Sequence, residues 1–147
     1  LMSPFVALRA YCFLGLLEAV VAMAAFFLVL FQGGWQYGAV LPTESTLYVQ
    51  ATTACFTAIV VMQIVNVYLC RSARRSVFSI GFAGNRLIVW GVLVEIAVLL
   101  FACYTPVGNA LIGTAPVPAA VWWLVIPCAV LLLVLEELRK WWVRRTQ

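Results

Sequence analysis

The sequence predicts an all-α membrane protein, in which four apolar helices cross the bilayer as an up-down bundle. Of its 147 residues, 66% are hydrophobic and only 10% are charged, and the mean hydropathy is +1.10. Soluble domains are closer to half apolar, and so short a chain has too small an interior to hide this much apolar surface. Lipid covers such surface without a large protein core. The composition therefore predicts that lipid is the solvent for most of the chain.

Four apolar stretches are each close to the roughly 20 residues that a helix needs to cross about 30 Å of hydrocarbon. Polar, glycine-containing or proline-containing segments separate them, as expected of turns at a membrane surface. We expect one transmembrane domain over residues 1–147, with spans at about 11–31, 51–69, 87–104 and 117–138.

The segments between the spans have different characters. The first connection begins with Gln-Gly-Gly-Trp at 32–35 and continues through a polar stretch at 42–45. The second carries an arginine-rich run at 71–75. The third begins with Thr-Pro-Val-Gly-Asn at 105–109 and has a further proline, Pro116, before the last span. Each of these compositions favours a turn over a continued helix.

Basic residues indicate how the spans are oriented. All nine lie before the first span, between the second and third, or after the fourth: Arg9, Arg71, Arg74, Arg75, Arg86, Arg139, Lys140, Arg144 and Arg145. In an up-down path these three places share one membrane face, which the positive-inside rule assigns to the cytoplasm. We therefore expect both termini in the cytoplasm and a multi-pass protein of the cell membrane. The net charge of +4 reflects this asymmetry, so no nucleic-acid partner is expected.

The chain lacks the residue patterns of most catalytic centres. It has no histidine, and its five cysteines have no paired spacing, so transition-metal chemistry is not expected. Phosphate-binding glycine motifs and hydrolase motifs are also absent. Residues 1–10 show no signal-peptide pattern, and we interpret the chain as a piece of a larger protein. By itself it is expected to hold no cofactor and to catalyse nothing.

Four polar residues lie inside the predicted spans: Glu18, Gln63, Asn66 and Glu95. An unpaired charge there costs at least about 2.5 kcal/mol. At about 1.5 Å per residue from the cytoplasmic end, Glu18, Gln63 and Glu95 lie about 10, 9 and 12 Å deep, in one layer. They form either a cation or proton site, in which carboxylate and amide oxygens replace hydration water, or hydrogen bonds that clip the helices together.

The spacing of these residues along the spans predicts in which direction their side chains point. Steps of three and four along the second span connect Thr53, Thr57, Gln63, Asn66 and Cys70, with Val60 between Thr57 and Gln63, which predicts a semi-polar face turned away from lipid. Gly91 precedes Glu95 by one turn and is expected to let a neighbouring backbone approach that carboxylate. Near the end of the last span, Glu136 and Lys140 have the i, i+4 spacing of a helical salt bridge.

Two stretches resemble parts of the membrane domain of P-type cation pumps. The sequence CRSARRSVF at 70–78, with Gln63 and Asn66 before it, resembles the junction after the eighth membrane helix, especially in the sodium/potassium and proton/potassium branch. The sequence NRLI at 85–88, followed by Glu95, resembles the ninth helix.

Two further stretches complete the resemblance. The sequence LEELRK at 135–140 resembles the end of the tenth helix, and residues 10–35 resemble the seventh helix and the start of its outer loop. The four stretches occur in the order and spacing of the sodium/potassium and calcium pump class and cover nearly the whole chain. The resemblance therefore implies the C-terminal membrane domain of such a pump.

In that class the phosphorylated aspartate and the site for ATP and magnesium precede this domain. The resemblance thus implies that the chain supports the transport helices, with the lipid bilayer, the remaining transmembrane and cytoplasmic domains, and the transported cation as its partners. Acids on the eighth and ninth helices of the sodium-pump branch contribute to a cation site or a proton path. The matching positions are Asn66, with Gln63 one turn before it, and Glu95.

The sequence also departs from the sodium-pump pattern. Asn66 stands where an aspartate is expected, and Val94 where an acid usually precedes Glu95. The ion thus stays open among calcium, sodium, protons and others. The first outer loop is short, so an accessory subunit of the sodium-pump type is not expected.

Two other functions compete with the pump. One is a small exporter, in which Glu18 alternates between a proton and a cationic drug in a symmetric dimer. Exporters of that kind have shorter loops and lack a basic, aromatic-flanked tail. The other is a structural membrane subunit that binds a partner.

Overall fold

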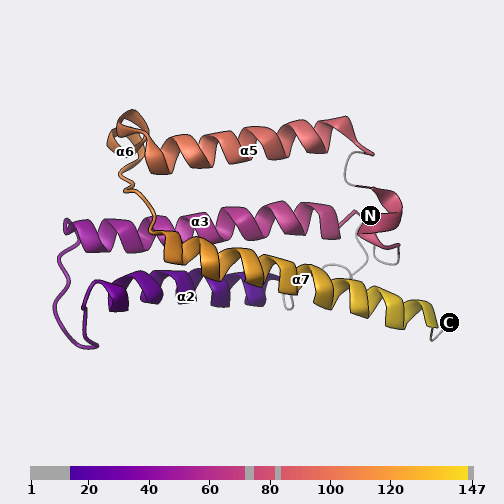
Figure 1. Ribbon diagram of the computed structural model, residues 1–147, viewed down its shortest axis with the longest axis horizontal. Helices are drawn as coiled ribbons and strands as arrows, with labels where there is room; N and C mark the ends of the chain where they lie inside the picture. Colours follow the sequence, from indigo (N-terminus) through magenta and orange to yellow (C-terminus); the bar gives the residue numbers. More distant parts are fainter. Residues whose placement is uncertain (1–13, 72–74, 82–83, 146–147) are drawn as a thin grey trace.

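The computed structural model describes residues 14–71, 75–81 and 84–145, and these residues form helices and no strand. Four helices are long and apolar enough to cross a membrane, as predicted (Figure 1). They are α2 (Gly15–Gln32), α3 (Thr46–Leu69), α5 (Arg86–Tyr104) and α7 (Ala119–Arg145). Two short helices, α4 (Val77–Ile80) and α6 (Pro106–Ile112), lie in the connections on either side of α5. The fold is therefore the all-α bundle that the composition predicts.

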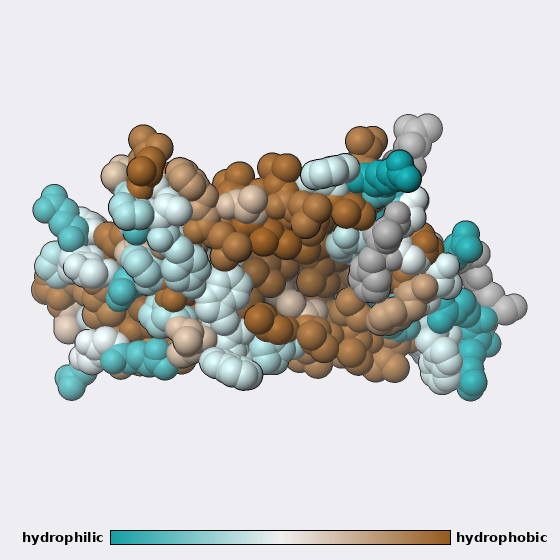
Figure 2. Space-filling view, turned by 45° about the horizontal axis from the view of Figure 1, so that its top comes forward, coloured by the Kyte–Doolittle hydropathy of each residue, from teal (hydrophilic) through white to brown (hydrophobic). Residues whose placement is uncertain are grey.

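Successive long helices run in opposite directions, and α3 lies between α5 and the pair formed by α2 and α7 (Figure 1). Helix α3 packs most extensively against α2, and it also packs against α7 and α5. Helix α5 is the least buried of the four. On the face that Figure 2 shows, hydrophobic residues gather over the middle of the molecule and hydrophilic ones at its two ends. This distribution is the one expected of a membrane-spanning domain.

Alanines allow α2 and α3 to pack closely. Five of them are at most 4% exposed: Ala22, Ala25, Ala51, Ala54 and Ala58. Lipid tails are as apolar as leucine, so membrane helices associate through close van der Waals contact, which small side chains permit. The core extends from this interface to the buried residues Met62, Val121, Val125 and Leu132. The tight contact fixes the position of α2 relative to α3.

Helix boundaries differ from the predicted spans where capping residues operate. Helix α3 begins at Thr46 and not at residue 51, because the Ser45 hydroxyl accepts the backbone N–H of Tyr48 at 3.3 Å. The predicted turn at 105–109 is largely α6, which Thr105 caps and Pro106 begins. Helix α7 continues beyond residue 138 to Arg145. The predicted start of the first span, at residue 11, lies outside the described residues.

At the basic end of the bundle, side chains of α7 form hydrogen bonds with backbone groups at the ends of two other helices. The Lys140 Nζ donates to the Leu69 carbonyl at 3.2 Å and lies 3.7 Å from Glu137 Oε1. The same carboxylate oxygen accepts the backbone N–H of Val77 at 2.9 Å, at the start of α4. Lys140 is fully buried. These contacts, which we call the Lys140 clamp, hold α3, α4 and α7 together, because they satisfy backbone groups that helix ends leave unpaired.

The described basic residues gather at the same end of the bundle, where α3 and α7 end and α5 begins (Figure 1). They are Arg71, Arg75, Arg86, Arg139, Lys140, Arg144 and Arg145, and Arg9 and Arg74 lie outside the described residues. Arg139 forms an ion pair with Glu136 at 2.8 Å, with i, i+3 spacing. Which side of the membrane this end faces remains a prediction.

Candidate functional site

Three of the four intramembrane polar residues meet between α2 and α3. Glu18 lies in the first turn of α2. Gln63 and Asn66 are spaced i, i+3 in the second half of α3, so their side chains leave the helix on neighbouring positions of one face. Because α2 and α3 are antiparallel, the beginning of α2 lies opposite the later part of α3. We call Glu18, Gln63 and Asn66 the Glu18 trio.

Amide groups surround the carboxylate of Glu18. The Gln63 Nε2 donates to Glu18 Oε1 at 2.9 Å and to Oε2 at 3.1 Å. The Asn66 Nδ2 donates to Glu18 Oε2 at 3.1 Å. Hydrogen bonds to an ionised acceptor are roughly twice as strong as those between neutral groups. These contacts partly compensate for the cost of placing a carboxylate inside a membrane span.

One oxygen of the Glu18 trio is left without a partner. The Oδ1 of Asn66 is buried and has no hydrogen-bond partner among the described residues. Leaving such an acceptor unpaired costs about 1–3 kcal/mol. Glu18 and Asn66 are half-buried and Gln63 is exposed, so the Glu18 trio lies at an open edge of the α2–α3 interface. A buried acceptor beside a carboxylate is the arrangement that a cation or a further donor would satisfy.

Glu95 does not join the Glu18 trio in the described structure. It is half-buried in α5, and no hydrogen bond or ion pair joins it to another described residue. The buried residues of α5, Leu99, Ala102 and Cys103, lie in its last two turns, so α5 meets the bundle beyond Glu95. Apart from its own stretch of α5, no described residue has an atom within 4 Å of a Cβ added at Gly91, so the expected close approach of a neighbouring backbone is not found there.

The predicted semi-polar face of α3 divides into two parts. Thr53 and Thr57 are buried and lie towards the end of the bundle opposite the Glu18 trio. The Thr53 hydroxyl accepts the backbone N–H of Ala115 at 3.1 Å, and the Thr57 oxygen lies 3.5 Å from the sulfur of Cys103. The face is split because each step of three, from Thr57 through Val60 to Gln63, falls about 60° short of a full helical turn, so the side chains of Thr57 and Gln63 leave α3 in directions about 120° apart.

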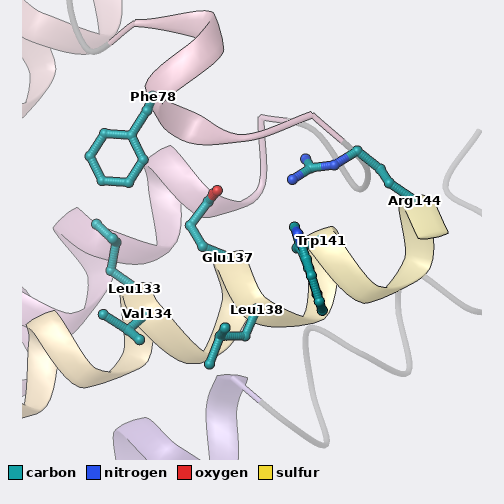
Figure 3. Close-up of a pocket in the computed structure, with 7 residues that line it drawn as sticks. All are labelled: Phe78, Leu133, Val134, Glu137, Leu138, Trp141 and Arg144. Carbon is teal, nitrogen blue, oxygen red and sulfur yellow. The ribbon is translucent and has the colours of Figure 1, made fainter.

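A groove near the basic end lies between α4 and α7 and has a volume of about 410 Å³ (Figure 3). Phe78 lies across from Leu133 and Val134, and Arg144 lies at the far end. Its lining is Phe78, Leu133, Val134, Glu137, Leu138, Trp141 and Arg144. The Glu137 carboxylate already accepts a backbone N–H and pairs with Lys140. This groove therefore offers a cation no available cluster of oxygens, unlike the Glu18 trio.

Sequence reasoning missed the role of the Lys140 clamp. The spacing predicted a salt bridge between Glu136 and Lys140. In the structure Lys140 is fully buried, donates to the Leu69 carbonyl and lies 3.7 Å from Glu137 Oε1. A lysine one turn beyond two glutamates gave the signal of a salt bridge, although nothing in the spacing identified Leu69 as its backbone partner. In the described residues, no group of three or more histidine, cysteine, aspartate or glutamate side chains comes together. The Glu18 trio, with one carboxylate and two amides, is thus the site that chemistry favours.

Comparison with known proteins finds matches over nearly the whole chain. Residues 1–142 match the family described as "Cation transporting ATPase, C-terminus". The chain is 26% identical over 160 residues to "Sodium/potassium-transporting ATPase subunit alpha-1" of Catostomus commersonii, covering 92% of this chain and 16% of that protein. The alpha-2 subunit of Homo sapiens gives the same identity and coverage. "Potassium-transporting ATPase alpha chain 1" of Xenopus laevis is 27% identical over 170 residues, or 99% of this chain and 16% of that protein.

Proposed function

The chain belongs to the family of C-terminal domains of cation-transporting ATPases, and from this premise we propose that it supports the transport helices of an ATP-driven pump. It is the C-terminal transmembrane domain of a P-type cation ATPase, a multi-pass integral protein of the cell membrane. The chain spans 16% of the length of the curated relatives that it matches. We therefore propose, for the whole protein, that it hydrolyses ATP, transports a cation and contains the remaining pump domains.

In this proposal, ATP and magnesium bind to the preceding part of the pump, and the chain contributes no catalytic group. The absence of a phosphate-binding or hydrolase motif from the sequence supports that division. Both termini lie in the cytoplasm, together with the basic residues that α3, α5 and α7 bring to one end. Lipid surrounds the apolar middle of the bundle.

The Glu18 trio contributes to a cation or proton site in the pump. The observation that carries this proposal is a carboxylate held by two amides inside a membrane span, with the buried Asn66 Oδ1 left unpaired beside it. Hydrogen bonds that only clipped α2 to α3 would be expected to satisfy their buried acceptors. Glu95 contributes through helices that precede this chain, because a half-buried carboxylate in a membrane span needs a partner.

The competing functions fit less well. Family membership favours the pump over the small exporter. A structural subunit that binds a partner requires no polar site at mid-membrane depth.

Transport by the intact protein in liposomes tests the proposed function. We expect ATP to drive uptake of an inorganic cation, and Glu95→Gln to change the apparent affinity or its pH dependence more than the protein level. An equal loss of activity and protein would assign Glu95 a packing role. Uptake of an organic cation that is driven by a proton gradient and needs no ATP would identify the exporter instead.

A further inference from the structure

We propose that the turn at residues 33–41, which we call the Tyr37 turn, is an interfacial anchor that inserts Tyr37 and Val40 into the lipid bilayer. The anchor lies at the boundary between headgroups and acyl chains, at the end of the bundle opposite the basic residues. Its partner is an electrically neutral lipid surface. The inference rests on the membrane location of the domain and does not depend on the ion that the pump transports.

The Tyr37 turn exposes apolar side chains. Val40 is 94% exposed and Tyr37 is 91% exposed, the two highest fractions among the large hydrophobic side chains of the described residues. Both belong to the connection between α2 and α3 and not to a membrane-spanning helix. Contact between water and this apolar surface is unfavourable, whereas the headgroup–acyl boundary covers the surface and lets a tyrosine hydroxyl reach water. The exposed pair therefore points to lipid.

The charge pattern of the connection separates an apolar half from a polar half. Between Glu18 and Glu44 the sequence contains no aspartate, glutamate, lysine or arginine. A charged side chain resists entering a bilayer, so its absence allows the Tyr37 turn to enter. Thr43 and Glu44, which follow the turn, are polar and exposed, and they return the chain to water before α3 begins. The two halves of the connection match the two sides of a membrane surface.

Aromatic rings join the Tyr37 turn to the exposed side of α2. The ring of Phe31 lies 5.9 Å from that of Trp35, and the ring of Trp35 lies 6.2 Å from that of Tyr37. Phe31 is 56% exposed on a helix that is long and apolar enough to cross a membrane. Tryptophan and tyrosine are enriched where a span meets the membrane surface. The row of rings therefore continues from a membrane-spanning surface into the turn.

Hydrogen bonds hold the Tyr37 turn in shape. The Trp35 Nε1 donates to the Ala39 carbonyl at 3.0 Å, and the backbone N–H of Ala39 donates to the Gln36 carbonyl at 3.0 Å. Gly38 has a φ of +90°, which residues with a side chain rarely adopt. Because these contacts already order the tip, inserting its side chains into lipid requires little further loss of conformational freedom.

The place of the Tyr37 turn in the bundle agrees with an interfacial position. In Figure 1 the connection between α2 and α3 swings out sideways, on the side of α2 away from α3, and α3 begins farther out than α2 ends. The turn therefore extends laterally beside the end of a span. The preceding part of the protein joins α2 at the other end of that helix, where the basic residues lie.

Nitroxide labels on the intact protein in phosphatidylcholine nanodiscs test the anchor. One label is attached to Tyr37→Cys, and its matched control is attached to Thr43→Cys in the polar half of the same connection. Wild-type protein treated with the same reagent supplies the background from native cysteines. Oxygen partitions into lipid and a nickel chelate stays in water, so we expect the ratio of collision rates with oxygen and nickel to be about fivefold higher at residue 37 than at residue 43.

Two results of this measurement would overturn the inference. Equal ratios at residues 37 and 43 would place the turn in water. Exclusion of both reagents from residue 37 would show that another part of the pump, or a partner protein, covers the turn. Replacing part of the phosphatidylcholine by phosphatidylglycerol should leave the ratio at residue 37 unchanged, and a high ratio found only with the anionic lipid would contradict a neutral partner.

A label at Val40→Cys tests whether Tyr37 itself inserts. We expect Tyr37→Asp to lower the oxygen-to-nickel ratio at residue 40 to the value found at residue 43, because the new charge draws the turn into water. Tyr37→Phe is the matched control and should keep the ratio high. Equal ratios in the two variants would overturn the insertion of Tyr37. Val40→Asp with the label at residue 37 repeats the comparison if Tyr37→Asp fails to fold.

Discussion

The alanine interface between α2 and α3 makes a strong prediction about Ala54→Leu. Ala54 is 0% exposed on the helix that packs most extensively against α2. Ala51 and Ala58, three residues before and four residues after it, are equally buried on the same stripe. A leucine adds three carbon atoms where no free surface remains. Either α2 must move away from α3, or the leucine must adopt a strained rotamer.

The expected cost follows from that burial. Overpacking a well-packed interior typically costs about 1–3 kcal/mol. For a domain of about 150 residues, each kcal/mol lowers Tm by about 2–4 °C, so we expect a fall of about 2–12 °C. Separation of α2 from α3 would also lengthen the contacts of the Glu18 trio. We therefore expect weaker cation binding together with the lower Tm.

Thermal unfolding of the purified intact protein in nanodiscs measures this effect. Ala97→Leu is the matched control, because Ala97 is exposed on α5 and the same atoms would be added on the outer surface of the bundle. We expect its Tm to change little. Equal Tm values for the two variants would show that α2 and α3 are not closely packed and that the reasoning from small residues is wrong.

Other substitutions probe the remaining contacts through the same unfolding measurement. At Gly108 an added Cβ would overlap the backbone carbonyl oxygen of Phe101, so Gly108→Ala should destabilise by about 1–3 kcal/mol; wild-type stability would contradict that packing. Gly91→Ala meets no described atom within 4 Å apart from its own stretch of α5 and should stabilise α5 by about 0.5–1 kcal/mol; a large loss of stability would reveal a close neighbour. Lys140→Met leaves the Leu69 carbonyl and a carboxylate without their buried partner, and we expect a loss of about 3–5 kcal/mol; a neutral effect would mean that the Lys140 clamp does not stabilise the fold.

Hydropathy predicted the four spans well because the free energy of placing a residue in lipid depends mainly on that residue. The ends of the helices depend on single hydrogen bonds, and hydropathy does not report them. Because Ser45 caps it, α3 begins at Thr46, before the predicted start of the span. A helix that Thr105 caps and Pro106 begins lies where a turn was expected. These residue types are helix-starting signals, so capping patterns could have located both starts.

The candidate site was predicted only in part. Counting the helical rise placed Glu18, Gln63 and Glu95 at one depth, but depth does not determine which helices are neighbours or how each is rotated. The buried alanines bring Glu18 to Gln63, whereas α5 meets the bundle beyond Glu95. The sequence therefore identified the polar residues inside the spans but not which of them meet.

The contacts on both sides of the Glu18 trio hold α2 and α3 in place. On one side, the buried alanines hold α3 against α2. Beyond Asn66, the Lys140 clamp holds the end of α3 at Leu69. Displacing α3 to admit an ion would disrupt both contacts, and close-packed interiors resist such deformation. An ion must therefore reach the Glu18 trio with both helices in place, so we expect Lys140→Met to change cation binding by the intact protein less than Glu18→Gln does. An equal change in the two variants would show that α3 moves to admit the ion.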